Sequence, residues 1–278
     1  MSPSVVILGH VCHDIIPHGH RLGGAASYAS LLASSLGLQP QVITSYGQDF
    51  AYESLFSQHG VILHNQPSES TTIFHNQDKG DMREQRMEAR AGDLFFDSTF
   101  VNDFDIAFVC PIADEVDIYN TNLDNTVMVG LLQGWMRDSR KTGPVVPKEL
   151  DPRILDNIDI AICSEEDLKL FGASYLDRLT QLHNHLVITH GSKGVTIIIE
   201  GTSSFFPSYQ TEVIDSTGAG DIYGMAYTLA FHDSHNVATA ASFAHAAASL
   251  SIEGYGTDAI PSLEEIKVRQ ELYQKRYL

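Results

Sequence analysis

The chain has 278 residues, of which 43% are hydrophobic, and a formal net charge of −18 at pH 7. This length and apolar content suffice for the core of one large α/β domain. The negative charge argues against nucleic acid or an anionic membrane surface as a partner. No apolar run reaches the length of a membrane span and no basic segment precedes the first predicted strand, so we expect a cytoplasmic protein.

The N-terminal third predicts alternating strands and helices, interrupted by a small lid. A buried strand at residues 4–9 is followed by a helix at residues 22–36, which Gly37 ends. The alternation continues to about residue 63. Two antiparallel strands are then expected at residues 71–77 and 85–90, joined by a turn at 78–81. We therefore predict one domain over residues 1–278, with lid strands inserted at about 71–92.

The rest of the chain predicts a return to alternating strands and helices. Strands are expected at residues 106–112, 127–132 and 158–163, and a hairpin follows at 186–199. The last third is predicted to be helical, at residues 222–231, 237–251 and 263–277.

The segment from Asp215 to Asp221 carries the clearest chemical signal. Gly218, Ala219 and Gly220 precede an apolar helix, so their backbone N–H groups can approach a phosphoryl group or a developing anion at the helix N-terminus. Asp221 stands directly behind them, where a carboxylate can act as a general base on a hydroxyl. The pattern indicates phosphoryl transfer, while a capped turn is the purely structural alternative.

This segment resembles the C-terminal signature of the ribokinase-like (PfkB) carbohydrate kinases, in which the last Asp is the catalytic base. The resemblance implies a three-layer α/β/α sandwich with a small β-strand lid. It also implies an ATP-dependent phosphotransferase with an alcohol group as acceptor, ATP and Mg²⁺ as cofactors, and a small sugar or polyol as substrate. Asp14 and the Gly23-Gly24 pair stand where that family binds the hydroxyls of its sugar.

Two segments, a hairpin and a helix, resemble elements that lie beside the nucleotide in this family. Thr189, Gly191 and Gly194 match the family's Thr-x-Gly-x-x-Gly turn, which lies along the nucleotide. His245 replaces the Asn of a run beside the adenine. A tight structural hairpin and close packing of an Ala-rich helix remain open as alternatives.

The ion sites follow the family less closely. The family's Asn-x-x-Glu, which serves magnesium through bound water, is replaced here by residues 164–167, so Glu166 and Asp167 are the candidates for magnesium. A Ser N-cap followed by acids in a first helical turn is an equally good structural explanation. By resemblance, Asp215 and the loop 254–256 would hold a monovalent cation such as K⁺.

Three short segments, at residues 9–14, 23–27 and 132–137, resemble the inositol kinases of this family. By this resemblance, myo-inositol is a candidate acceptor. Gln133 and Arg137, in the third segment, are candidate substrate-binding residues. A nucleoside kinase, with Tyr28, Phe74 and Trp135 as walls for a base, is one alternative. A non-catalytic polyol-binding regulator is another. A homodimer formed through exposed lid strands is a third open question.

Overall fold

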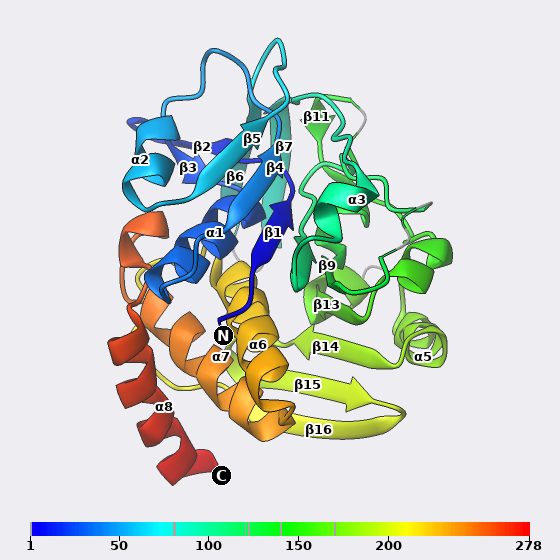
Figure 1. Cartoon of the computed structure of the whole chain (residues 1–278), viewed down its shortest axis with the longest axis vertical. Coiled ribbons are helices and arrows are strands. Elements are labelled where there is room, and N and C mark those ends of the chain that lie inside the picture. Colours follow the sequence, from blue (N-terminus) through cyan, green and yellow to red (C-terminus); the bar gives the residue numbers. More distant parts are fainter. Residues whose placement is uncertain (1, 80–81, 120, 122, 140, 170) are drawn as a thin grey trace.

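The computed structural model describes residues 2–79, 82–119, 121, 123–139, 141–169 and 171–278. Their main sheet has nine strands in the order β16-β15-β14-β13-β9-β8-β1-β4-β5, and all of them except β15 run in one direction (Figure 1). The bounds are β1 Val5–Leu8, β4 Gln41–Thr44, β5 Ile62–Asn65, β8 Ile106–Val109, β9 Val127–Leu131, β13 Ile160–Ser164, β14 His185–Thr189, β15 Gly194–Ile199 and β16 Thr202–Pro207.

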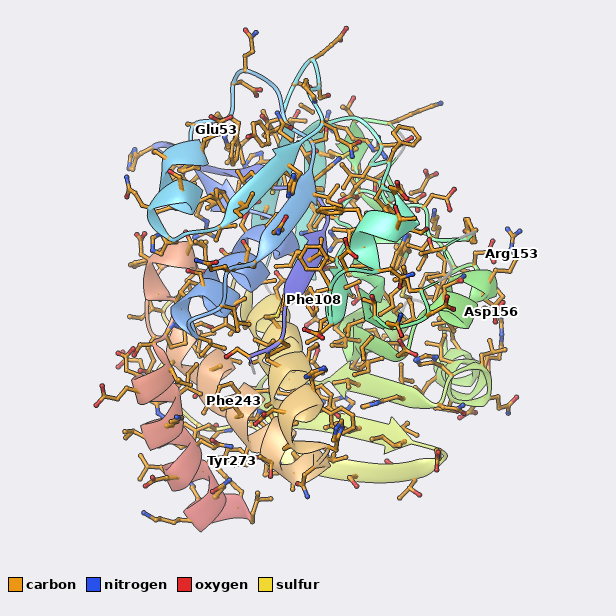
Figure 2. All side chains as sticks on the ribbon, viewed as in Figure 1. Glu53, Phe108, Arg153, Asp156, Phe243 and Tyr273 are labelled. Atoms are coloured by element: carbon orange, nitrogen blue, oxygen red, sulfur yellow. The ribbon has the colours of Figure 1, made fainter. Side chains whose placement is uncertain are left out.

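Helices cover both faces of this sheet, which gives the three layers that the sequence predicts. Alternation along β1 sends Val5 and Ile7 into one core and Val6 and Leu8 into the other. Phe108, in β8, lies in the first core, whereas Arg153 and Asp156 lie at the periphery (Figure 2). The first core is covered by α1 Ala25–Ser35, α2 Glu53–Gln58, α6 Ala219–Ser234, α7 Val237–Ser251 and α8 Leu263–Tyr277. The second is covered by α3 Ser98–Val101, α4 Glu165–Lys169, α5 Ala173–Leu182 and the 3₁₀ turn η2 Pro152–Asn157.

The lid is a separate sheet and is larger than predicted. Its five strands lie in the order β11-β7-β6-β2-β3, with the bounds β2 Cys12–Ile16, β3 Gly19–Gly23, β6 Thr72–Lys79, β7 Met82–Ala89 and β11 Gly143–Pro144. No strand was predicted between residues 9 and 22, but β2 pairs with β3 and, in parallel, with β6. Such pairing with a distant segment leaves little local signal. In the predicted turn at 78–81, Gly80 and Asp81 lie outside the described residues.

Two predicted helices near the C-terminus are found, whereas other elements differ from the prediction. The predicted helices at 237–251 and 263–277 are found, and Asn236 and Ser262 cap them through their side chains. The described residues between β8 and β9, however, form no covering helix, and β16 was not predicted. A two-stranded ribbon, β10 Arg137–Asp138 with β12 Val146–Pro147, follows the 3₁₀ turn η1 Leu132–Gly134. Among the described residues, no helix is long and apolar enough to cross a membrane.

Candidate active site

A cavity of about 180 Å³ lies between the lid and the carboxyl ends of the sheet strands. Ligands of open α/β sheets typically bind at this edge. The cavity brings together most of the residues predicted to hold the acceptor and to perform the chemistry: Asp14, Gly24, Gln133, Arg137, Gly218, Gly220 and Asp221. The lid adds Phe74, Asn76 and Gln85, which the sequence analysis did not assign to acceptor binding except for Phe74 as a possible wall.

Asp14 is held in place by a short chain of lid amides. Its side chain is buried, and Asn76 Nδ2 donates a hydrogen bond to Asp14 Oδ1 at 3.2 Å. Gln85 Nε2 in turn donates to Asn76 Oδ1 at 2.8 Å. Phe74 and Asn76 are two residues apart on β6 and both line the cavity, so strand alternation could have revealed Asn76 once β6 was placed beside Asp14.

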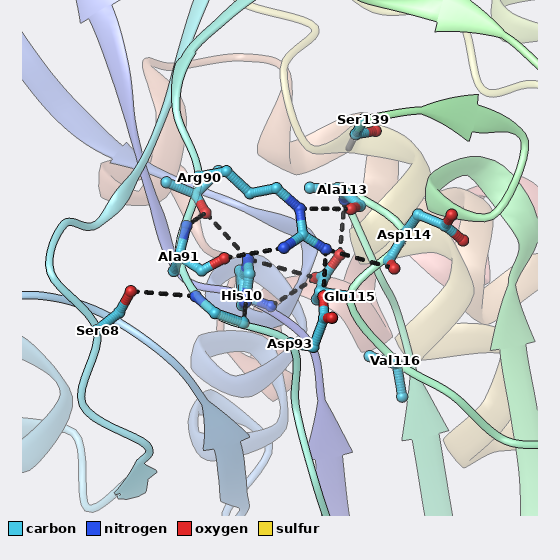
Figure 3. A network of polar contacts seen from close by, with 12 residues as sticks. His10, Ser68, Arg90, Ala91, Asp93, Ala113, Asp114, Glu115, Val116 and Ser139 are labelled. Atoms are coloured by element: carbon cyan, nitrogen blue, oxygen red, sulfur yellow. Dashed lines mark hydrogen bonds and ion pairs between the residues drawn. The ribbon is translucent and has the colours of Figure 1, made fainter. Parts of the chain in front are cut away.

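Figure 3 shows a buried polar network around His10, Arg90 and Glu115. The fully buried carboxylate of Glu115 accepts hydrogen bonds from the backbone N–H groups of His10, Ile112 and Ala113, at distances of 2.6 to 3.0 Å. Arg90 Nε donates to the carbonyl oxygen of Ala113 at 3.1 Å. The network therefore joins the ends of β1 and β8 and fixes Ile112, which lines the cavity.

The predicted anion site, residues 218–220, lies where the loop before α6 enters the helix. Gly218 adopts the left-handed region with φ of 79°, where a side chain is disfavoured, and it is the N-cap of α6. A Cβ at this position would also stand 2.7 Å from Tyr28 Cγ. Ala219 N donates to the carbonyl oxygen of Ser216 at 3.3 Å. The first N–H groups of a helix have no partner within the helix and point toward its N-terminal end. Asp221 lies in this first turn and lines the cavity of about 180 Å³ between the lid and the sheet.

A second cavity, of about 300 Å³, lies on the other side of the same loop. It contains the predicted nucleotide-side residues Thr189, Gly191, Gly194 and His245, together with Ala219. Much of the remaining lining is apolar: Val195, Val213, Tyr223, Ala248 and Ile252. Ser216 and Gly220 line both cavities, so the two spaces meet at the predicted anion site.

His245 forms part of the wall of this second cavity but is itself buried. Its Nε2 lies 3.2 Å from the carbonyl oxygen of Phe206, and its ring stacks on Tyr273 with centroids 5.2 Å apart. Burial lowers the pKa of His245 to about 4, although the contact with the Phe206 carbonyl opposes this. The imidazole is therefore neutral at pH 7, and it can contribute surface to a ligand but no charge.

Two of the candidate ion ligands, Asp167 and Asp215, have protein partners. Ser164 Oγ donates to Asp167 Oδ2 at 2.6 Å, and Asp167 N donates to Ser164 Oγ at 3.1 Å, which is the geometry of a helix cap. Glu166 and Asp167 line neither of the two cavities as described. Asp215 is paired with Arg21. No three His, Cys, Asp or Glu side chains of the described residues form a group that could hold a metal ion.

One proposed aromatic wall is excluded by the structure. Trp135 is only 2% exposed, packs in the second core and donates from Nε1 to the carbonyl oxygen of Val116 at 2.8 Å. Tyr28 and Phe74 do line the acceptor cavity. Two of the three aromatic side chains expected to contact the base in a nucleoside kinase therefore line this cavity.

Comparison with known proteins agrees with this architecture. Residues 135–264 match the model of the pfkB family carbohydrate kinases. Ribokinase of Lactococcus lactis is 28% identical over 45% of this chain and 43% of its own length, so the match spans less than half of that relative. Inositol 3-kinase of Arabidopsis thaliana is 25% identical over 98% of this chain and 80% of its own length.

A solved structure extends the likeness to the whole fold. It is a pyrophosphate-dependent kinase in the ribokinase family, complexed with a pyrophosphate analog and myo-inositol. The TM-score is 0.79 at 19% identity, and the superposition covers 95% of this chain and 99% of that one. The chain therefore has a ribokinase-like fold, and residues 135–264 of it are similar to the pfkB family carbohydrate kinases.

Proposed function

We propose that the protein transfers the γ-phosphoryl group of ATP to a hydroxyl of a small sugar or cyclitol. The observation that carries the proposal is that the two cavities share Ser216 and Gly220, with Asp221 on the acceptor side of the boundary. A donor in the larger cavity and an acceptor in the smaller one would thus meet at the N-terminus of α6. Each reactant is held by its own set of residues, and the reacting groups are brought together there.

In the proposed reaction, Asp221 takes the proton of the acceptor hydroxyl as its oxygen attacks the γ-phosphorus. The new O–P bond forms while the bond from the γ-phosphorus to the β,γ-bridging oxygen breaks, and ADP leaves with that oxygen. The backbone N–H groups of Gly218, Ala219 and Gly220 stabilise negative charge on the transferred phosphoryl oxygens. Asp14, Gly23, Gly24, Gln133 and Arg137 orient the acceptor, and Thr189, Gly191, Gly194 and His245 line the nucleotide side.

Magnesium would be held chiefly by the phosphates and by water, because no cluster of carboxylates is present in the described part of the chain. Its chemistry when bound is to neutralise charge on the phosphates. Asp167 is engaged in the cap with Ser164. Of the two candidate magnesium ligands, this leaves Glu166 as the carboxylate outside the cap.

The size and polarity of the acceptor cavity support a small polyol, with myo-inositol as the first acceptor to test. About 180 Å³ is less than the roughly 300–1,000 Å³ usual for drug-sized ligands. Asp14, Asn76, Gln85, Gln133 and Arg137 supply donors and acceptors for several hydroxyls. An Arabidopsis relative is an inositol 3-kinase and a structural neighbour is complexed with myo-inositol, which favours the same class here.

The test is phosphoryl transfer to myo-inositol, ribose, fructose, adenosine and cytidine, with ATP and with pyrophosphate as donors in the presence of Mg²⁺. We expect ADP release with one polyol, because the apolar lining of the donor cavity suits a nucleobase. Transfer from pyrophosphate alone would contradict the proposed donor. Failure with every acceptor, accompanied by stabilisation of the protein by a polyol, would favour a binding regulator instead.

A further inference from the structure

Arg21 joins the lid to the loop that leads into α6. It lies on β3, and Asp14 is its partner across the β2–β3 ladder. From there its Nη1 forms an ion pair with Asp215 Oδ2, and its Nη2 donates to Thr217 Oγ1 at 2.8 Å. One guanidinium therefore connects the strand pair that carries the acceptor carboxylate to the segment that begins the anion site.

Asp215 also accepts hydrogen bonds from the surrounding backbone. Its Oδ1 accepts from Thr217 N at 2.9 Å, and its Oδ2 also accepts from Gly256 N at 3.2 Å. The Asp215 carboxylate is therefore paired with a cation of this chain and with backbone donors of two loops.

Arg21 has no direct route to either reactant. It does not line the acceptor or the donor cavity as described, and both terminal nitrogens are engaged with Asp215 and Thr217. Its Nε is buried with no hydrogen-bond partner among the described residues. Any effect on the reaction must then pass through the loop at 215–218.

We propose that Arg21 is a positioning residue, a built-in cation that fixes the Asp215 carboxylate and the anion-site loop, so that the reaction requires no monovalent metal ion at Asp215. This inference rests on the proposed phosphoryl transfer. A guanidinium is permanently charged and directs several donors in a fixed plane, whereas K⁺ would have to share Asp215 with that positive charge. The guanidinium of Arg21 thus takes the place of the monovalent cation that the sequence led us to expect at Asp215.

The experiment compares the native protein with Arg21→Ala and with Arg86→Ala. Arg86 is a matched control because it is also a lid arginine, paired with Glu88 at 3.0 Å on the exposed surface. Rates are measured in KCl, CsCl and tetramethylammonium chloride at constant ionic strength. We expect the native and Arg86→Ala proteins to be insensitive to the cation. Arg21→Ala should lose roughly 10- to 100-fold in turnover and regain part of it, saturably, with K⁺.

Hydrogen exchange of a peptide covering residues 211–222 provides a second readout that does not depend on activity. Exchange should be faster in Arg21→Ala and unchanged in Arg86→Ala. Strong K⁺ activation of the native protein, or native turnover in Arg21→Ala, would overturn the proposal. So would unchanged exchange in Arg21→Ala. If the native protein transfers no phosphoryl group at all, the proposed function fails, and the exchange experiment alone decides whether Arg21 holds the loop.

Discussion

Gly23 lies directly against the carboxyl group of Asp14: a Cβ at position 23 would stand 2.6 Å from Asp14 Cγ. The two residues are on neighbouring strands, β3 and β2, and the missing side chain leaves the space that the carboxylate occupies. Gly23→Ala should push Asp14 away from the acceptor. We expect the KM for the polyol to rise roughly 10- to 100-fold, measured by acceptor titration at saturating ATP.

Gly92→Ala is the matched control for this substitution. A Cβ at Gly92 would meet only Ser45 Oγ, at 3.8 Å, so it fits without displacing its neighbours. The KM of Gly92→Ala should remain native. An unchanged KM in Gly23→Ala would mean that Asp14 does not bind the acceptor, or that it tolerates the displacement.

The sequence predicted the start of α6 better than it predicted the lid. Residues 214–221 are a continuous segment whose small residues and helix start can be recognised locally, and α6 does begin there, at Ala219. The support of Asp14 could not be predicted, since Asn76 and Gln85 reach it only after β6 pairs with β2 in the folded sheet. Likewise, Arg21 and Asp215 are far apart in the sequence, and nothing in either local pattern indicates their ion pair.

Asp221 is tested by Asp221→Asn, which keeps the shape of the side chain but removes the general base. We expect turnover to fall roughly 100- to 10,000-fold, while polyol binding measured by calorimetry stays near the native value. Asp233→Asn, in the last turn of the same helix and on the exposed surface, is the control and should retain native turnover. Native turnover in Asp221→Asn would exclude Asp221 as the base.

Gly218 and Gly220 should respond differently to alanine, although both belong to the proposed anion site. Gly218→Ala places a side chain at positive φ and against the ring of Tyr28, so we expect a loss of roughly 1–3 kcal/mol in the free energy of unfolding. Gly220→Ala meets nothing within 4 Å and lies in a helix, so stability should be unchanged or slightly higher.

Turnover separates the structural effect from the functional one. In Gly220→Ala the new methyl group projects into space that borders both cavities, and we expect turnover to fall on the order of tenfold or more despite native stability. Urea unfolding and steady-state kinetics on the two variants provide both measurements. Full activity in Gly220→Ala would argue that reactants do not meet at this point.

The buried histidines predict how stability depends on pH. Burial lowers the pKa values of His185 and His245 to about 4, whereas an unfolded histidine titrates near 6.5. Below pH 6.5 the unfolded chain binds protons that the folded chain does not, so the free energy of unfolding should decrease as the pH falls from 6.5 toward 4. Each histidine should contribute on the order of 2 kcal/mol between pH 7 and pH 5.

His245→Asn isolates one of the two contributions. The variant removes the titrating ring, so its stability should fall less steeply than that of the native protein between pH 7 and pH 5, as measured by urea unfolding at several pH values. The matched control is His64→Asn, which removes an imidazole at an exposed position. Equal slopes for His245→Asn and the native protein would mean that His245 is already protonated in the folded state at pH 5.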